Sequence, residues 1–306
     1  MSADDENIDA DVSSSCCASC GTAGNDDVKL RKCTACYLVS YCGIKCQKDH
    51  RPKHKRACKN RAAVLRDELL FKQPESSHLG DCPICCLPLS LDPKKSSMWT
   101  CCSKVICAGC DYANQKQEFL KRLEPKCPFC RKKLPKTKEE GDGYEMKRAE
   151  ANDPVALRQL GIQCREGGDY EGAFEYWSRA AELGDADAHY QLSVMYQLGA
   201  GVEKDKKKEL HHLERAAIGG HPLSRKNLGV IEMGVGRYER AVKHFTIAAY
   251  LGCDKSLEAL KHMYQAGMAN KEDFSEALRA YQAAVAAIKS PQREVAEEYR
   301  RNNPGT

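Results

Sequence analysis

The sequence predicts small cysteine-rich α+β modules followed by an all-α helical-repeat solenoid. Two observations support this prediction. All of the 19 cysteines except Cys164 and Cys253 precede residue 131, and most of them form closely spaced pairs. From residue 152 onward, apolar residues recur at intervals of 32 to 36 positions. Clustered cysteine pairs are typical of small metal-stabilised modules, and a repeat of this length is typical of stacked helix pairs.

The composition indicates a reducing compartment. Residues 1–15 are acidic and polar, so no signal peptide is expected, and no apolar run is long enough to span a bilayer. Cysteine pairs in a reducing compartment are more often metal ligands than disulfides, and an odd total of 19 argues against a complete disulfide framework. The net charge of +5 comes from mixed acids and bases. We therefore expect a cytoplasmic or nuclear protein with neither a membrane nor a nucleic acid as its partner.

The stretch from Cys82 to Cys130 contains nine cysteines, as three C-x-x-C pairs, one adjacent pair and the expected spare residue Cys86. Two intervening residues allow the tight turn that brings two thiolates to one zinc ion, at a Zn–S distance of about 2.3 Å. Eight thiolates fill two sites of four ligands. The expected ligands are Cys82, Cys85, Cys101, Cys102, Cys107, Cys110, Cys127 and Cys130.

The spacing C-x2-C-x15-C-C-x4-C-x2-C-x16-C-x2-C resembles a RING finger, in which alternate ligand pairs share a zinc ion. The resemblance implies one ion held by Cys82, Cys85, Cys107 and Cys110, and another held by Cys101, Cys102, Cys127 and Cys130. Lys104 lies near the position of the usual histidine. The all-cysteine RING variant also has four residues between its fourth and fifth ligands, which implies that Cys102 is the fourth ligand here. The third ligand, Cys101 or another group, is left open.

The same resemblance implies a function. In active RING ligases an apolar residue at the position of Ile84 contacts the ubiquitin-conjugating enzyme, a proline is common at the position of Pro128, and a cation at the position of Arg131 bridges that enzyme and ubiquitin. The resemblance therefore implies that these three residues bind partners. Such a ligase has no catalytic residue of its own, because it works by orienting two proteins. We interpret the chain as a RING-type ubiquitin ligase. The alternative is a non-enzymatic scaffold, in which Ile84 packs locally and Arg131 lies on a solvated surface. Lys104 favours that alternative.

An earlier cluster has the spacing C-x2-C-x12-C-x2-C-x5-C-x3-C-x7-H-x3-C and closely resembles a MYND finger. The family's cross-brace implies one ion bound by Cys17, Cys20, Cys42 and Cys46, and another bound by Cys33, Cys36, His54 and Cys58. Cys16 is expected to be spare, although it could replace Cys17. The i, i+4 spacings Cys42/Cys46 and His54/Cys58 predict that each pair shares one face of a short helix. All sites are full, so about four structural zinc ions are expected. MYND fingers bind proline-rich peptides, but Arg51 stands where the family commonly has tryptophan.

The third region repeats. Its periodic positions are Leu160, Leu192, Leu228 and Leu260, then Trp177, Leu213, Phe245 and Tyr281, then Ala180, Ala216, Ala248 and Ala284. Gly184, Gly220 and Gly252 close three units and suit a left-handed helix cap. The block from Ala188 to Gly220 resembles the SEL-type, tetratricopeptide-like repeat. That resemblance implies a right-handed solenoid whose concave face binds protein segments.

These patterns predict the following organisation. The expected parts are a disordered tail (1–15), a MYND-type finger (16–58), a helical spacer (59–80), a RING-like finger (81–133), a linker (134–151), four SEL-type repeats (152–290) and a fraying C-terminal tail (291–306). The spacer helix is expected to end before Pro74. Within the RING-like finger, a helix is expected over Asp111–Lys126.

Overall fold

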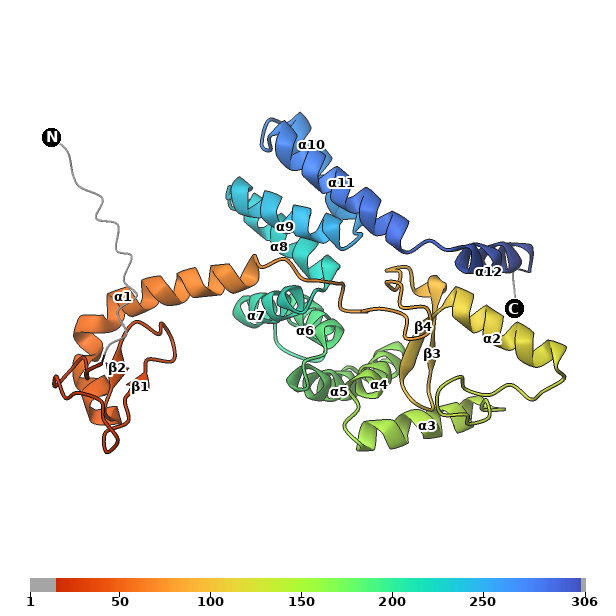
Figure 1. Ribbon diagram of the computed structural model, residues 1–306, viewed down its shortest axis with the longest axis horizontal. Coiled ribbons are helices and arrows are strands. Elements are labelled where there is room, and N and C mark those ends of the chain that lie inside the picture. Colours follow the sequence, from red (N-terminus) through yellow and green to blue (C-terminus); the bar gives the residue numbers. More distant parts are fainter. Residues whose placement is uncertain (1–14, 304–306) are drawn as a thin grey trace. The chain divides into compact units, whose positions relative to one another are not determined.

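The computed structural model describes residues 15–303 (Figure 1). The expected disordered tail therefore lies, apart from Ser15, outside the described residues. The chain divides into two compact units, Met1–Leu70 and Phe71–Thr306.

The first unit is a small finger with one long helix. Strands β1 (Arg31–Lys32) and β2 (Ser40–Tyr41) pair antiparallel, with Arg31 opposite Tyr41. Helix α1 runs from Ile44 to Leu70 without a break, so the finger and the expected spacer share one helix. It ends four residues before Pro74, in agreement with the expected stop. Among the described helices, none is both long and apolar enough to cross a membrane.

The second unit begins with a β-hairpin and a helix. After the 3-10 turn η1 (Pro93–Lys95), β3 (Ser96–Trp99) pairs antiparallel with β4 (Lys104–Cys107), in the register that sets Ser96 opposite Cys107. Helix α2 spans Ala108–Leu120, which is earlier than the expected Asp111–Lys126. It starts early because Cys107 Sγ accepts the N–H of Cys110 as an N-cap (3.4 Å), and it is followed by Arg122 in a left-handed conformation (φ 52°).

The rest of the second unit is a stack of helix pairs, in which α4 packs on α5, α6 on α7, α8 on α9 and α10 on α11. The bounds are α4 Pro154–Glu166, α5 Tyr170–Glu182, α6 Ala186–Leu198, α7 Lys206–Ile218, α8 Pro222–Gly234, α9 Tyr238–Tyr250, α10 Asp254–Gln265 and α11 Lys271–Ala287. The periodic leucines are buried in the first helix of each pair, and Trp177, Leu213 and Phe245 are buried in the second. The paired alanines let the helices approach closely, since Ala180, Ala216 and Ala248 are fully buried.

Two segments differ from expectation. The expected linker 134–151 forms helix α3 (Lys138–Glu150), which packs on α4 and is N-capped by Thr137 Oγ1. The expected fraying tail forms helix α12 (Pro291–Asn302), which packs beside α2 (Figure 1). Both segments are strongly charged, so their polarity suggested exposure. They are ordered because each buries a few residues against a neighbour, Ala149 in α3 and Arg293 and Ala296 in α12.

Candidate metal centres

The structure brings the expected ligands together in four groups. Within each group one ligand atom per residue lies within 4.8 Å of the others. The groups are Cys17, Cys20, Cys42 and Cys46 (group 1); Cys33, Cys36, His54 and Cys58 (group 2); Cys82, Cys85, Cys107 and Cys110 (group 3); and Cys101, Cys102, Cys127 and Cys130 (group 4). Cys16 and Cys86 are exposed and belong to none of these groups. Cys17 rather than Cys16 is therefore the residue placed for ligation.

Groups 1 and 2 have the dimensions of tetrahedral zinc sites. Four sulfurs at about 2.3 Å from a zinc ion lie roughly 3.8 Å from one another. In group 1, Cys42 Sγ lies 3.6 Å from the sulfurs of both Cys20 and Cys46. In group 2, Cys33 Sγ lies 3.8 Å from Cys58 Sγ. The donor sets and their spacing therefore fit Zn2+.

Helix α1 positions three of these ligands. Cys46, His54 and Cys58 lie within it, and His54 and Cys58 are one turn apart on the same face. Cys42 precedes the helix, so the expectation that Cys42 and Cys46 share a helical face was wrong. The turn after β2 instead brings Cys42 beside Cys46.

His54 stacks on His50, which in turn contacts Tyr41, and neither of these two residues belongs to the four groups. His54 Nε2 lies 3.2 Å from Cys36 Sγ. Burial, followed by the charge of His50, lowers the pKa of His54, which favours the neutral imidazole that ligation requires. The ring of His50 stacks on that of His54, and His50 Nδ1 lies 3.1 Å from the hydroxyl of buried Tyr41. His50 was not identified from the sequence, although its position one turn before His54 was a usable signal.

The β3–β4 hairpin links groups 3 and 4. Cys107, at the end of β4, lies with its Sγ 3.8 Å from Cys85 Sγ in group 3. Cys101 and Cys102 occupy the turn between the strands, where their sulfurs lie 3.3 Å from Cys130 Sγ and 3.6 Å from Cys127 Sγ, respectively. The ligands of groups 3 and 4 alternate along the chain, and the hairpin separates them: its turn carries ligands of group 4, and the end of β4 carries a ligand of group 3.

The adjacent cysteines can both reach group 4 because of the turn they occupy. The N–H of Cys102 donates to the carbonyl of Trp99 (3.1 Å), and Ser103 is left-handed, with a φ of 55°. Lys104 follows as the first residue of β4, opposite Trp99, and its side chain is exposed. Lys104 is therefore directed to solvent, and Cys101 is the residue that the structure brings beside Cys102, Cys127 and Cys130.

Four of the cysteine pairs share one backbone turn. In each pair the residue after the second cysteine donates its N–H to the carbonyl of the first and has a positive φ. These residues are Gly21 (φ 75°), Tyr37 (58°), Cys86 (55°) and Arg131 (61°). The left-handed conformation turns the chain back so that both thiols face one point. This role accounts for Gly21.

The three residues expected to bind partners lie on these turns. Ile84 is 44% exposed within the Cys82–Cys85 turn, which is a high exposure for an isoleucine. Pro128 is half-buried and Arg131 is exposed at the last turn of group 4. Helix α2 adds two exposed apolar side chains, Phe119 at 82% and Leu120 at 64%. This finger therefore presents apolar side chains that its own core does not use.

A fifth group of potential ligands consists of His78, Asp187 and His221. Its Asp187 carboxylate already accepts from Arg158 Nη1 (3.1 Å) and lies 3.3 Å from His221 Nε2. His221 Nδ1 accepts the N–H of Ser224 as an N-cap (3.1 Å), so the proton of a neutral His221 lies on Nε2, facing Asp187. Ion pairing and tautomer both disfavour a cation here.

We interpret this fifth group as a structural network. Burial is the largest influence on Asp187 and opposes its ionisation, but the hydrogen bond from His221 and the charge of Arg158 hold the pKa of Asp187 below its usual range. Burial, followed by the charge of His221, lowers the pKa of His78 to about 3. The N–H of His78 donates to the Gly220 carbonyl (3.1 Å). The network therefore attaches the segment before the second finger to the repeats.

Comparison with known protein families agrees with part of this architecture. The family model of the MYND finger matches residues 17–58, and that of the Sel1 repeat matches residues 154–185, 186–221 and 227–253. The chain thus contains a MYND finger, which binds zinc, and Sel1 repeats, and both kinds of module mediate protein–protein interactions. The α10–α11 pair, where Ile288 replaces the closing glycine, lies outside these matches. The RING-like finger is indicated by its cysteine groups alone.

Individual relatives match only parts of the chain. The DAP3-binding cell death enhancer 1 of Mus musculus is 26% identical over 180 residues, which covers 46% of this chain and 35% of that protein. The chain therefore spans about a third of the length of this curated relative. A Sel1 repeat protein from Oxalobacter formigenes is 30% identical in its crystal structure (TM-score 0.44; 50% of this chain, 66% of the other). A protective antigen of uropathogenic Escherichia coli with an SLR fold is 25% identical (TM-score 0.42; 49% and 34%).

Proposed function

We propose that the protein is a RING-type ubiquitin ligase that recruits protein partners through its MYND finger and Sel1 repeats. The observation that carries the proposal is the arrangement of groups 3 and 4. The first and third cysteine pairs of residues 82–130 converge, as do the second and fourth, and this alternation resembles the cross-brace of a RING finger. The exposed side chain of Ile84 lies on the first of these pairs, where a ligase contacts its conjugating enzyme.

The same proposal assigns four zinc ions, one to each of groups 1 to 4. Each group offers four thiolate or imidazole ligands and leaves no coordination position open, so the ions are structural rather than catalytic. The fingers are too small to fold on apolar burial alone, and zinc binding would supply their folding free energy. Thiolate ligands stay reduced in the cytoplasm or nucleus, which is the compartment we propose.

A ligase of this kind acts by orientation. Ile84 and Pro128 would hold the conjugating enzyme, and Arg131 would bridge the enzyme and ubiquitin. The left-handed backbone at Arg131 is set by the turn that holds Cys127 and Cys130. Zinc binding and the placement of the cation are therefore linked, and loss of zinc from group 4 would release Arg131 from its position.

The second candidate is a non-enzymatic scaffold. It is favoured by Lys104, which lies exposed on β4 and replaces the usual histidine, and by the exposed Arg51 in the MYND finger. The MYND finger and the Sel1 repeats alone support this coarser function. DAP3 is the first partner to test under either candidate, because a relative of the chain is named for binding it.

The deciding experiment is a ubiquitin-transfer assay against a panel of conjugating enzymes, with zinc-loaded full-length protein. We expect chain formation that is lost in Ile84→Ala while the zinc content stays unchanged. Val230→Ala is the matched control, because Val230 is also an aliphatic residue with 44% exposure but lies on α8. No transfer with any enzyme of the panel, with zinc in place, would exclude the ligase and leave the scaffold.

A further inference from the structure

Arg293 is a buried cation on helix α12, whose other charged residues are not buried. It lies in the first turn of α12, where Ser290 Oγ accepts its N–H as the helix cap (3.3 Å). Its side chain is not directed to solvent, and the residue is only 7% exposed. A buried charge is tolerated only when it is paired and hydrogen-bonded, so the partners of this guanidinium indicate its role.

The guanidinium is directed at the first cysteine pair of group 3. Nη2 donates to Cys85 Sγ (3.4 Å) and to the carbonyl of Leu87 (3.1 Å). Nη1 donates to the carbonyls of Pro88 (2.7 Å) and Ile288 (2.9 Å). Leu87 and Pro88 follow directly after Cys85 and Cys86, so the rigid fork of donors holds the exit of this turn and one of its sulfurs.

The backbone of the same residue covers the second cysteine pair of group 3. Gly109 lies between Cys107 and Cys110, and a Cβ at Gly109 would be 2.9 Å from Arg293 N. Gln292 Nε2 also donates to the Gly109 carbonyl (3.2 Å). The first turn of α12 therefore contacts both halves of group 3.

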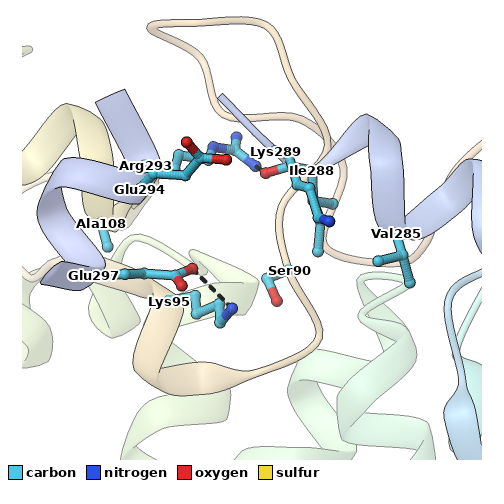
Figure 2. A pocket seen from close by; sticks show the side chains of 9 residues that line it. All are labelled: Ser90, Lys95, Ala108, Val285, Ile288, Lys289, Arg293, Glu294 and Glu297. Atoms are coloured by element: carbon cyan, nitrogen blue, oxygen red, sulfur yellow. Dashed lines mark hydrogen bonds and ion pairs between the residues drawn. The ribbon is translucent and has the colours of Figure 1, made fainter. Parts of the chain in front are cut away.

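Further contacts along α12 hold the helix on the finger. Lys95 Nζ pairs with Glu297 at 2.7 Å, and the rings of Tyr112 and Tyr299 lie 4.8 Å apart. Figure 2 shows the Lys95–Glu297 pair at the edge of a cavity of about 180 Å³, with Arg293 on the other side. These contacts fix the position of the Arg293 backbone independently of its guanidinium.

The charge of group 3 explains why a cation belongs there. Four thiolates and one Zn2+ leave two uncompensated negative charges. Cys82, Cys107 and Cys110 are buried, so water screens that charge poorly. A guanidinium N–H donated to a thiolate is a charge-assisted hydrogen bond, and outer-shell groups of this kind tune metal affinity.

We propose that Arg293 is an outer-shell cation of group 3, through which the C-terminal helix determines how firmly this one site retains zinc. The inference rests on the zinc assignment of group 3 and does not require ligase activity. It predicts that a substitution outside the finger, more than 160 residues after its last cysteine (Cys130), weakens one zinc site and leaves the others unchanged.

The test follows zinc release from full-length, zinc-loaded protein into a chromogenic chelator. Arg293→Met removes the charge at similar length, and we expect one ion to leave about 10–100-fold faster while the remaining ions keep their wild-type rates. Arg293→Lys retains a cation, and should restore slow release in part. Arg301→Met, a change at an exposed position of the same helix, should behave as the wild type. Maleimide labelling read by mass spectrometry assigns the ion, because Cys82 and Cys107 should label faster and Cys127 should not.

The outcomes separate this inference from the zinc assignment. Wild-type release in Arg293→Met, with the helical content unchanged, would overturn the inference alone. Equal rates for Arg293→Met and Arg293→Lys would overturn the role of the charge. Cys82 and Cys107 that label in the wild type without any chelator would overturn the zinc assignment as well. If Arg293→Met does not fold, Tyr299→Ala loosens α12 away from the cysteines, and it should speed release of the same ion.

Discussion

The ring of Trp177 packs against the backbone of Gly161, and its indole Nε1 donates a hydrogen bond to the carbonyl of Arg158 at 3.1 Å. A Cβ at Gly161 would lie 2.5 Å from Trp177 Cδ1, and a Cβ at Gly229 would similarly lie 2.7 Å from Phe245 Cε1. In these two repeats the residue after the periodic leucine is glycine, because the large ring of the second helix packs onto the backbone there.

This packing predicts opposite effects for two helical glycines. Gly161→Ala should lower the free energy of unfolding of the repeats by about 1–3 kcal/mol, since the added methyl overpacks against Trp177. Gly143→Ala is the matched change in α3, where nothing lies within 4 Å of the new Cβ. It should raise stability by up to about 1 kcal/mol through helix propensity. Urea unfolding followed by circular dichroism measures both, and equal effects would contradict the packing argument.

Acid should destabilise the repeats through two facing histidines. His189 Nδ1 and His212 Nδ1 lie 2.9 Å apart, between α6 and α7. Burial is the main cause that lowers the pKa of each histidine to about 4. The charge of His212 lowers the pKa of His189 further, and the charge of His211 lowers the pKa of His212 further. Free histidines titrate near 6.5, so between pH 6.5 and 4 the unfolded state binds more protons, and stability falls as the pH falls.

The measurement is urea unfolding at pH 7 and pH 5. His212→Gln removes one of the two histidines, and the loss of stability between these two pH values should become smaller. His262→Gln, at an exposed position on α10, is the control and should leave the loss unchanged. Any loss of zinc at pH 5 is common to all three proteins and cancels in the comparison. The same pH dependence in His212→Gln and in the wild type would rule out this pair as its source.

Metal removal should unfold the first finger and spare the repeats. The buried apolar core of residues 17–58 consists of Cys17, Cys33, Cys36 and Tyr41, so most of it is ligand. The repeats have an apolar core of their own, centred on residues such as Phe245 and Leu260. With a strong chelator at neutral pH, we expect amide exchange by mass spectrometry to lose protection over 17–58 and to keep it in α9. Protection should return when zinc is added. Unchanged protection over 17–58 would mean that the finger folds without its metal.

The ligands of group 4 can be tested by zinc stoichiometry. Cys102→Ser should lower the content by one ion, because Cys102 Sγ lies 3.6 Å from Cys127 Sγ within the group. Cys86→Ser and Lys104→Ala should both retain the wild-type content, since these exposed residues lie outside every group. Metal analysis of the purified variants decides the matter. Loss of an ion in Lys104→Ala would show that the region around β4 holds metal in another way.

The pairing of the cysteines could be predicted because ligand spacing is a local property, whereas the sharing of one ion by two distant pairs was implied only by the resemblance to the MYND and RING fingers. Two residues between cysteines restrict the backbone to a turn that brings both thiols to one point, and that turn recurs at Gly21, Tyr37, Cys86 and Arg131. The repeats were predictable for a similar reason. The residues on the buried face of each helix pair recur periodically in the sequence, and the periodic leucines, Trp177 and Phe245 are buried in the structure.

The supporting residues could not be predicted in this way. His50 supports His54 through ring stacking, and Arg293 reaches Cys85 across 208 positions of the sequence. Helix α12 is strongly charged, and its few apolar side chains, such as Ala296 and Tyr299, do not identify its partner in the sequence. The first turn of α12 can pack against Gly109 because glycine has no side chain there, which leaves room for the backbone of Arg293.

The sequence by itself determined which cysteines share a turn and which helical faces are buried, because both follow from contacts within a few tens of residues. Only the tertiary structure decided that α3 extends the repeats and that α12 covers group 3. The physical reason is that a polar helix is ordered by the particular charges and carbonyls it meets. Those partners belong to parts of the chain that are distant in the sequence, so no local pattern contains them.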